Sequence, residues 1–123
     1  DTFGHLVGDE ALRRIASCIA EATTGADLWG RIGGEEFVVF LHPADVTRAR
    51  AVADGIRRAV AAVELVIAGS RVPMSVSIGA ASVIDAFDPV DLFRRADEYL
   101  YRAKDGGRDR IVFDGAELGP LAA

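Results

Sequence analysis

The sequence predicts a mixed α/β (α+β) domain, a two-layer sandwich in which helices flank a mostly antiparallel sheet. Its 123 residues are a size typical of one domain, and half of them are apolar while 27% are charged, as in globular proteins. Segments with helical periodicity alternate with pairs of short strand-like segments. We therefore expect the order helix, hairpin, helix, hairpin, helix, strand over residues 1–113, and a flexible tail over residues 114–123.

The first helix is expected over residues 8–23, because apolar residues recur there at spacings of three and four. Asp9 and Glu10 stand at its expected start, where carboxylates complement the exposed amides of a helix N-terminus. The same helix contains Cys18, the only cysteine of the chain, which we interpret as a small packing residue. Since no intrachain disulfide can form, a reducing, cytoplasmic setting is expected.

A β-hairpin is expected next, with its tip in the tetrad Gly33-Gly34-Glu35-Glu36 and apolar, β-forming residues on both sides. Adjacent carboxylates at such a tip suit a divalent cation, and the glycines let backbone amides approach a phosphate group. A solvated turn explains this motif equally well when it is considered alone.

The remaining elements follow the same alternation. A second helix is expected over residues 45–63, strands over 64–68 and 72–83, and a final strand over 110–113. A third helix is expected after Asp88 and Pro89, because proline fits the first helical turn. The residues expected to face inward are Val46, Ala49, Val52, Ala53, Ile56 and Val60 in the second helix, and Leu92, Phe93, Ala96, Leu100 and Ala103 in the third.

Charge and hydropathy exclude two classes of partner. A net charge of −5 argues against a nonspecific nucleic-acid surface, which needs clustered lysine and arginine. No apolar run is long enough to cross a bilayer, so this domain is expected to have no membrane contact, although a membrane-attached parent protein stays open. The chain begins without an initiator methionine, which indicates a piece of a longer protein.

The motif at residues 33–37 resembles the signature of GGDEF domains, the catalytic domains of diguanylate cyclases, with glutamate at its third position. Further matches follow in the order found in that family. They are residues 1–9, residues 76–79, and the pairs Ala96-Asp97, Leu100-Tyr101, Ala103-Lys104 and Gly107-Arg108. Together these matches cover residues 1 to about 113.

This resemblance implies a ferredoxin-like, palm-type nucleotidyl cyclase fold that condenses two GTP molecules into cyclic di-GMP and releases pyrophosphate. It also implies two Mg²⁺ or Mn²⁺ ions per active site, a homodimer in which each domain holds one GTP, and an upstream sensory or regulatory domain. A non-catalytic GGDEF-like module that binds GTP or a partner protein is the alternative. A nucleotidyl-transfer domain with another substrate is a third hypothesis, which the match at residues 4–9 disfavours.

The resemblance also assigns roles to the hairpin tip. Glu35 is a metal ligand and a candidate base for the attacking hydroxyl, and Glu36 is a supporting metal or structural residue. Adjacent residues of a strand point to opposite faces, so the two acids are not expected to act equivalently. Gly33 and Gly34 permit close approach of amides to the phosphates.

Four residues outside the tip receive roles on the same basis. Asp9 is expected to recognise the guanine edge, with His5 in the same segment, although a helix cap also explains Asp9. Lys104 and Arg108 are expected to bind the β- and γ-phosphates and to stabilise the leaving pyrophosphate. Cations that complement a helix C-terminus are the competing explanation for either one.

Two departures from the family pattern limit these roles. The inhibitory product site R-x-x-D has Thr24 in place of arginine, although Asp27 keeps the acid, so weak or absent product inhibition is expected. Arg57 resembles a second contributor to that site, although an exposed helix residue is the simpler interpretation. The family's first central strand, which ends in a metal-binding aspartate, would precede Asp1, and this piece alone is therefore expected to be inactive.

Overall fold

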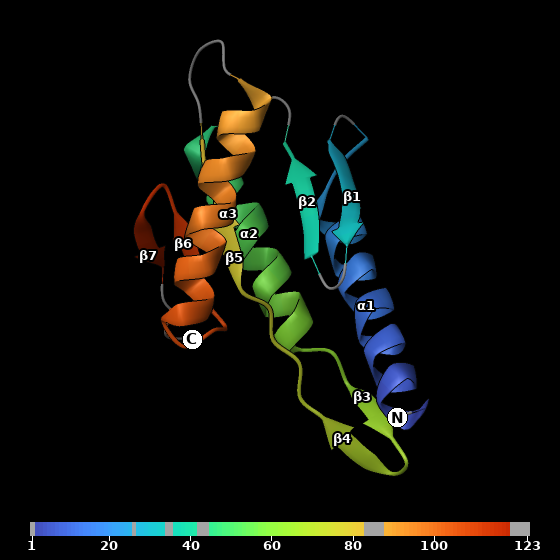
Figure 1. Ribbon diagram of the computed structural model, residues 1–123. Helices are drawn as coiled ribbons and strands as arrows, with labels where there is room; N and C mark the ends of the chain where they lie inside the picture. The colour runs from blue at the N-terminus through green and yellow to red at the C-terminus, as the bar shows by residue number, and fades with distance from the viewer. Residues whose placement is uncertain (1, 26, 34–35, 42–44, 83–87, 119–123) are drawn as a thin grey trace. The chain divides into compact units, whose positions relative to one another are not determined.

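The computed structural model describes residues 2–25, 27–33, 36–41, 45–82 and 88–118, which form mixed helix and sheet (Figure 1). They fall into two compact units, Asp1–Met74 and Ser75–Ala123. The first unit contains α1 (Thr2–Ala22), β1 (Leu28–Gly33), β2 (Glu36–Phe40), α2 (Val46–Ala61), β3 (Leu65–Ile67) and β4 (Ser70–Val72). The second contains β5 (Ile78–Ala80), α3 (Pro89–Asp105), β6 (Ile111–Phe113) and β7 (Ala116–Leu118). No helix within the described ranges is long and apolar enough to cross a membrane.

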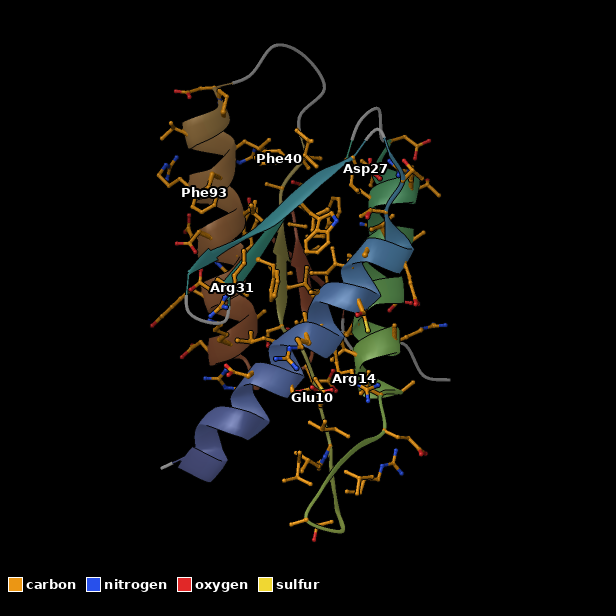
Figure 2. The ribbon with its side chains drawn as sticks, turned by 90° about the vertical axis from the view of Figure 1, so that its right-hand side faces the viewer. Glu10, Arg14, Asp27, Arg31, Phe40 and Phe93 are labelled. Carbon is orange, nitrogen blue, oxygen red and sulfur yellow. The ribbon has the colours of Figure 1, made fainter. Side chains whose placement is uncertain are left out.

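Helix α1 begins at Thr2, earlier than the sequence periodicity predicts. Asp9 and Glu10 consequently lie inside the helix, and the prediction that they sit at its N-terminus is wrong. Glu10 instead accepts a hydrogen bond from Arg14 Nε at 3.0 Å, one helical turn further along (Figure 2). Asp9 therefore does not cap this helix, and another role must explain an acid at this position.

Cys18 is buried in α1, as the packing interpretation predicts. Its burial raises the pKa of the thiol above the ordinary value, and the nearby Glu21 acts in the same direction. A thiol with a raised pKa stays protonated at neutral pH and is a poor nucleophile, so Cys18 contributes packing and no chemistry.

The hairpin of β1 and β2 is antiparallel, as predicted, with Leu28 opposite Phe40 at its open end and Gly33 opposite Glu36 near the tip. The register shifts between Arg31 and Gly33, which is a bulge of the kind that redirects side chains at a strand end. The tip residues 34 and 35 lie outside the described residues.

Helix α2 begins after Asp45, whose side chain accepts a hydrogen bond from Arg48 N at 2.7 Å and caps the helix. Ala53, Ile56 and Val60 are buried in the first unit, where α2 packs against α1. Val46 is 44% exposed, contrary to the prediction, because it is the first residue of the helix. Periodicity identifies the apolar face of a helix but not how far its neighbour extends along it.

The strand predicted over residues 72–83 is divided in the structure. β4 ends at Val72, where it pairs with Leu65 of β3, and β5 begins only at Ile78. Pro73 has no backbone N–H to donate to a ladder, which explains why the strand ends before it. The described strands form three small sheets and not one, but every pairing except that of β5 with β6 is antiparallel, so the predicted α+β class with mostly antiparallel strands is confirmed.

In the second unit, β5 and β6 pair in parallel, β6 and β7 pair antiparallel, and α3 packs against β5 and β6 (Figure 1). Pro89 occupies the first turn of α3, as predicted, and the structure adds that Asp88 caps the helix. Phe93 is 39% exposed and does not face inward as expected. Strand β7 occupies part of the predicted tail, because Asp114 and Gly115 adopt the positive φ values of a tight hairpin turn.

Helix α3 lies directly on the backbone of β5 at Gly79. A Cβ placed on Gly79 would lie 2.0 Å from Leu100 N and 2.3 Å from Ala96 O, which are backbone atoms of α3. No side chain fits between atoms at these distances. The absence of a side chain at Gly79 therefore sets how closely the helix approaches the sheet.

We predict that Gly79→Ala destabilises the protein by about 1–3 kcal/mol or more, because helix and strand must separate to admit the methyl group. Gly55→Ala is the matched control, since Gly55 lies in α2 and an added Cβ meets nothing within 4 Å. Alanine there should stabilise the helix by about 0.5–1 kcal/mol. Thermal unfolding of both variants tests this contrast, and equal midpoints for Gly79→Ala and the unmodified protein would contradict the packing account.

Candidate functional site

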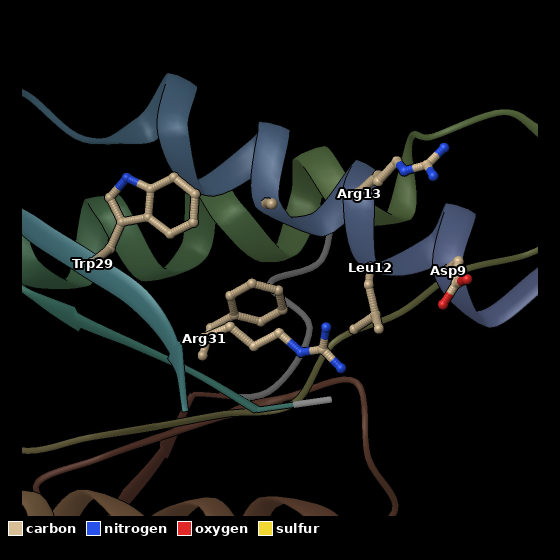
Figure 3. Close-up of a pocket in the computed structure, with 7 residues that line it drawn as sticks. Asp9, Leu12, Arg13, Trp29 and Arg31 are labelled. Carbon is tan, nitrogen blue, oxygen red and sulfur yellow. The ribbon is translucent and has the colours of Figure 1, made fainter. Parts of the chain in front are cut away.

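Within the first unit, α1 and the β1–β2 hairpin border an open pocket of about 350 Å³ (Figure 3). The residues that line it are Asp9, Leu12, Arg13, Ala16, Trp29, Arg31 and Phe37. A pocket of this volume falls within the range of small-molecule sites in proteins. It contains Asp9, which the sequence selects as a binding residue.

The secondary structure explains why these side chains meet. On α1, the lining residues recur at intervals of three and four, which places them on one helical face. On β1, Trp29 and Arg31 are two residues apart and so share a face, and Phe37 of β2 pairs directly with Arg31. The sequence interpretation missed the role of these three hairpin residues, although the alternation of the strand was available as a signal.

The pocket combines apolar walls with opposite charges. The rings of Trp29 and Phe37 lie 6.4 Å apart at an interplanar angle of 45°. The carboxylate of Asp9 can only accept hydrogen bonds, whereas the guanidinium groups of Arg13 and Arg31 can only donate them. Figure 3 shows Arg31 extending from the hairpin toward Leu12. Such a lining suits a planar ring with N–H donors that also carries negative charge.

Three of the other predicted site residues, Gly33, Glu36 and His5, belong to described elements of the first unit. Gly33 ends β1 and Glu36 begins β2 with its side chain half-buried, while Gly34 and Glu35 lie outside the described residues. His5 belongs to α1, but its side chain also lies outside them. In the part of the chain that the structure describes, no group of three or more His, Cys, Asp or Glu residues could hold a metal ion.

Lys104 and Arg108 belong to the second unit, at the end of α3. Lys104 lies in the last helical turn, and Arg108 follows in the α3–β6 turn, residues 106–109. Arg108 N donates to Ala103 O at 3.0 Å and Gly107 N to Lys104 O at 3.4 Å. This pair of bonds is a Schellman motif, which satisfies the last carbonyls of a helix and requires a left-handed residue after it.

Three consecutive residues of this turn have positive φ: Gly107 at 122°, Arg108 at 65° and Asp109 at 46°. Only glycine adopts this region without cost, so the backbone at Arg108 and Asp109 is strained by about 1 kcal/mol or more at each residue. Two strained residues therefore follow each other in the turn that carries Arg108.

The side chain of Asp27 is buried and hydrogen-bonded within the first unit. Its side chain is 0% exposed and accepts hydrogen bonds from Thr24 N at 2.8 Å and from Arg48 at 2.7 Å (Figure 2). The hydrogen bond to Asp27 raises the pKa of the Arg48 guanidinium, which therefore keeps its charge at any ordinary pH. Thr24, which stands where the resemblance implies an arginine, donates to Asp27 and helps to hold its carboxylate inside the protein.

Arg57 is also buried, at 6% exposure, and donates to Asp54 at 3.3 Å. The interpretation of Arg57 as an exposed helix residue is therefore wrong. The apolar residues at helical spacing marked one face of α2, and Arg57 follows the buried Ile56 directly, so its long side chain packs along the edge of that face.

Comparison with known proteins agrees with these features. The family model described as diguanylate cyclase, GGDEF domain, matches residues 1–110. Diguanylate cyclase A of Treponema denticola is 38% identical over 119 residues, which cover 96% of this chain and 32% of that protein. Response regulator PleD of Caulobacter vibrioides is 39% identical over 115 residues, which cover 91% of this chain and 25% of that protein. The chain thus spans a third or less of the length of these relatives.

Solved structures give the same result for the fold. The GGDEF domain of DgcB from Caulobacter crescentus, solved in complex with c-di-GMP, has a TM-score of 0.86 and 28% identity, over 94% of this chain and 70% of that one. Diguanylate cyclase SiaD of Pseudomonas aeruginosa, solved in complex with its activator SiaC, has a TM-score of 0.84 and 32% identity, over 92% and 44%. From its motifs, its fold and these matches, the chain belongs to the GGDEF domain family.

Proposed function

We propose that the protein containing this chain is a diguanylate cyclase that condenses two GTP molecules into cyclic di-GMP. Residues 1–113 are its GGDEF domain in this proposal. The observation that carries it is the position of Asp9 in a pocket with apolar walls and arginines, where a helix cap no longer explains that acid. Two of the similar proteins reported above, diguanylate cyclase A of Treponema denticola and SiaD of Pseudomonas aeruginosa, are named diguanylate cyclases, which favours the enzyme over a non-catalytic binding module.

Asp9 is proposed to recognise guanine. Its carboxylate would accept hydrogen bonds from the N1–H and the exocyclic amine of the base, a pair of donors that adenine lacks. Leu12 offers an apolar surface for the ring, and Arg31 offers a cation for the negative charge of the nucleotide. His5 precedes Asp9 on the same helix and is proposed as a secondary contributor.

The hairpin tip is proposed to hold Mg²⁺ or Mn²⁺, two ions per active site. Carboxylates such as Glu35 and Glu36 are the hard oxygen donors that these cations prefer, and one or two of them suffice where substrate phosphates complete the coordination. Bound ions would stabilise negative charge on the reacting phosphate. Gly33 and Gly34 would let backbone amides approach the same phosphates.

The proposed chemistry is a symmetric pair of phosphoryl transfers. The 3′-oxygen of one GTP attacks the α-phosphorus of the other, the bond to the β-phosphate breaks, and pyrophosphate leaves. Glu35 is the candidate acceptor of the hydroxyl proton, while Lys104 and Arg108 stabilise the negative charge on the leaving group. Because each domain would hold one GTP, the reaction requires a homodimer, and a regulatory domain in the parent protein is proposed to control its formation.

The role of Asp9 predicts a specific loss. Asp9→Ala should lower kcat/KM for GTP by roughly tenfold to a hundredfold, because hydrogen bonds to a charged acceptor are removed. Glu21→Ala is the matched control, since Glu21 is an exposed acid on the same helix that does not line the pocket. Rates of cyclic di-GMP formation by the full-length protein give the comparison. Unchanged kinetics in Asp9→Ala, or an equal loss in Glu21→Ala, would refute the guanine role.

The buried position of Asp27 predicts a structural role without product inhibition. Asp27→Ala should lower the free energy of unfolding by about 1–3 kcal/mol, because the buried donors of Thr24 and Arg48 lose their acceptor. Asp91→Ala removes an exposed pair with Arg94 and should cost less than about 1 kcal/mol.

Added cyclic di-GMP should inhibit neither the unmodified full-length protein nor Asp27→Ala through this acid. Denaturant unfolding measures the loss of stability in Asp27→Ala and Asp91→Ala, and initial rates with added cyclic di-GMP measure product inhibition. Tight product binding that disappears in a folded Asp27→Ala variant would show that the acid still serves an inhibitory site.

A further inference from the structure

The side chain of Arg110 lies across the α3–β6 turn. Its Nε donates to the carbonyl oxygen of Arg108 at 2.9 Å. Its terminal nitrogens lie beside the turn glycines. Nη2 is 2.5 Å from the position that a Cβ of Gly107 would take, and Nη1 is 3.3 Å from the position that a Cβ of Gly106 would take. The guanidinium therefore packs against the glycine backbone and donates a hydrogen bond to the carbonyl of Arg108, the next residue.

A second residue fixes Arg110 from the other side. Nη1 of Arg110 forms an ion pair with Glu117 Oε1 at 2.5 Å. Glu117 lies on β7, opposite Val112 of β6, and β7 lies beyond residues 1–110, which the family model matches. The Arg110 side chain is only 24% exposed, so the ion pair limits the rotamers open to it.

This turn needs such support because of its backbone. Arg108 and Asp109 both have positive φ, a conformation that non-glycine residues leave unless their surroundings hold them there. Relaxation of Arg108 toward negative φ would swing its side chain away from its present direction. The hydrogen bond from Arg110 Nε to the Arg108 carbonyl opposes that rotation.

We propose that Arg110 is a positioning residue for Arg108, and that Glu117 on β7 holds Arg110 in place. The inference rests on the proposed function, because it takes Arg108 as a ligand of the β- and γ-phosphates of GTP. Nε and Nη1 of Arg110 are engaged by the Arg108 carbonyl and by Glu117, and Nη2 faces Gly107, so the proposal gives Arg110 a positioning role, which a double variant distinguishes from direct phosphate binding. The strand after the family's matched residues thereby becomes part of the binding machinery.

Calorimetric titration of the full-length protein with two nucleotides in Mg²⁺ tests the proposal. The first is guanosine 5′-(α,β-methylene)triphosphate, which has β- and γ-phosphates but cannot react at the α–β bridge. The second is GMP, which lacks the β- and γ-phosphates. A positioning role affects the first ligand only, whereas general loss of structure weakens both.

Arg108→Ala should weaken binding of the triphosphate analogue by roughly tenfold to a hundredfold, and Arg110→Ala by roughly threefold to tenfold, with GMP binding unchanged. Glu117→Gln should act in the same direction as Arg110→Ala, and because Glu117 is half-exposed this variant should fold normally. Arg110→Lys should not restore affinity, because a single ammonium cannot reproduce the fork of a guanidinium. Arg94→Ala removes an exposed arginine of the same helix that pairs with Asp91, and it should change neither titration.

The double variant Arg108→Ala/Arg110→Ala decides whether Arg110 acts through Arg108. The proposal requires that Arg110→Ala causes no further loss once Arg108 is absent. A further loss of the same size, full affinity in Arg110→Lys, or unchanged binding in both Arg110→Ala and Glu117→Gln would overturn it. If Arg108→Ala itself has no effect, the phosphate role of Arg108 and the positioning role of Arg110 both fail.

Discussion

The direct contact between α3 and the backbone of β5 is the constraint on which the second unit depends. Gly79 allows this contact because no side chain fits between the strand and the helix backbone near Ala96 and Leu100. The contact sets where α3 ends relative to the sheet, and α3 ends in the turn that carries Arg108. A Schellman motif satisfies the carbonyls of that helix end, and Arg110 holds the strained residues that follow.

The first unit presents its candidate residues in a different way. Its pocket lies between one face of α1 and one face of the hairpin. It therefore depends on which residues of α1 share that face and on the pairing of Arg31 with Phe37. Asp27 has a structural role in the same unit. With threonine at position 24, the carboxylate accepts hydrogen bonds from its own turn and from Arg48, and it is buried.

Local signals predicted most of the fold, whereas long-range packing had to come from the structure. The start of α3 at Pro89 and the antiparallel hairpin depend on local signals, and these two predictions are confirmed. The burial of Arg57 and the exposure of Phe93 differ from the prediction, because periodicity does not identify which parts of a helix another element covers. The Asp-Gly pair at residues 114 and 115 is also a local signal, typical of the hairpin turn that precedes β7. Among the candidate site residues, the structure supplied the hairpin side chains around Asp9, because only pairing brings them to α1.

The most direct measurement is the product balance of the full-length protein incubated with GTP and Mg²⁺. We expect cyclic di-GMP and pyrophosphate in a ratio of one to two, and no cyclic product from ATP, because ATP lacks the donors that Asp9 would bind. Bound GTP without any cyclic di-GMP would contradict the enzymatic function and would favour a binding module. Cyclic product from ATP and GTP at equal rates would contradict the role given to Asp9.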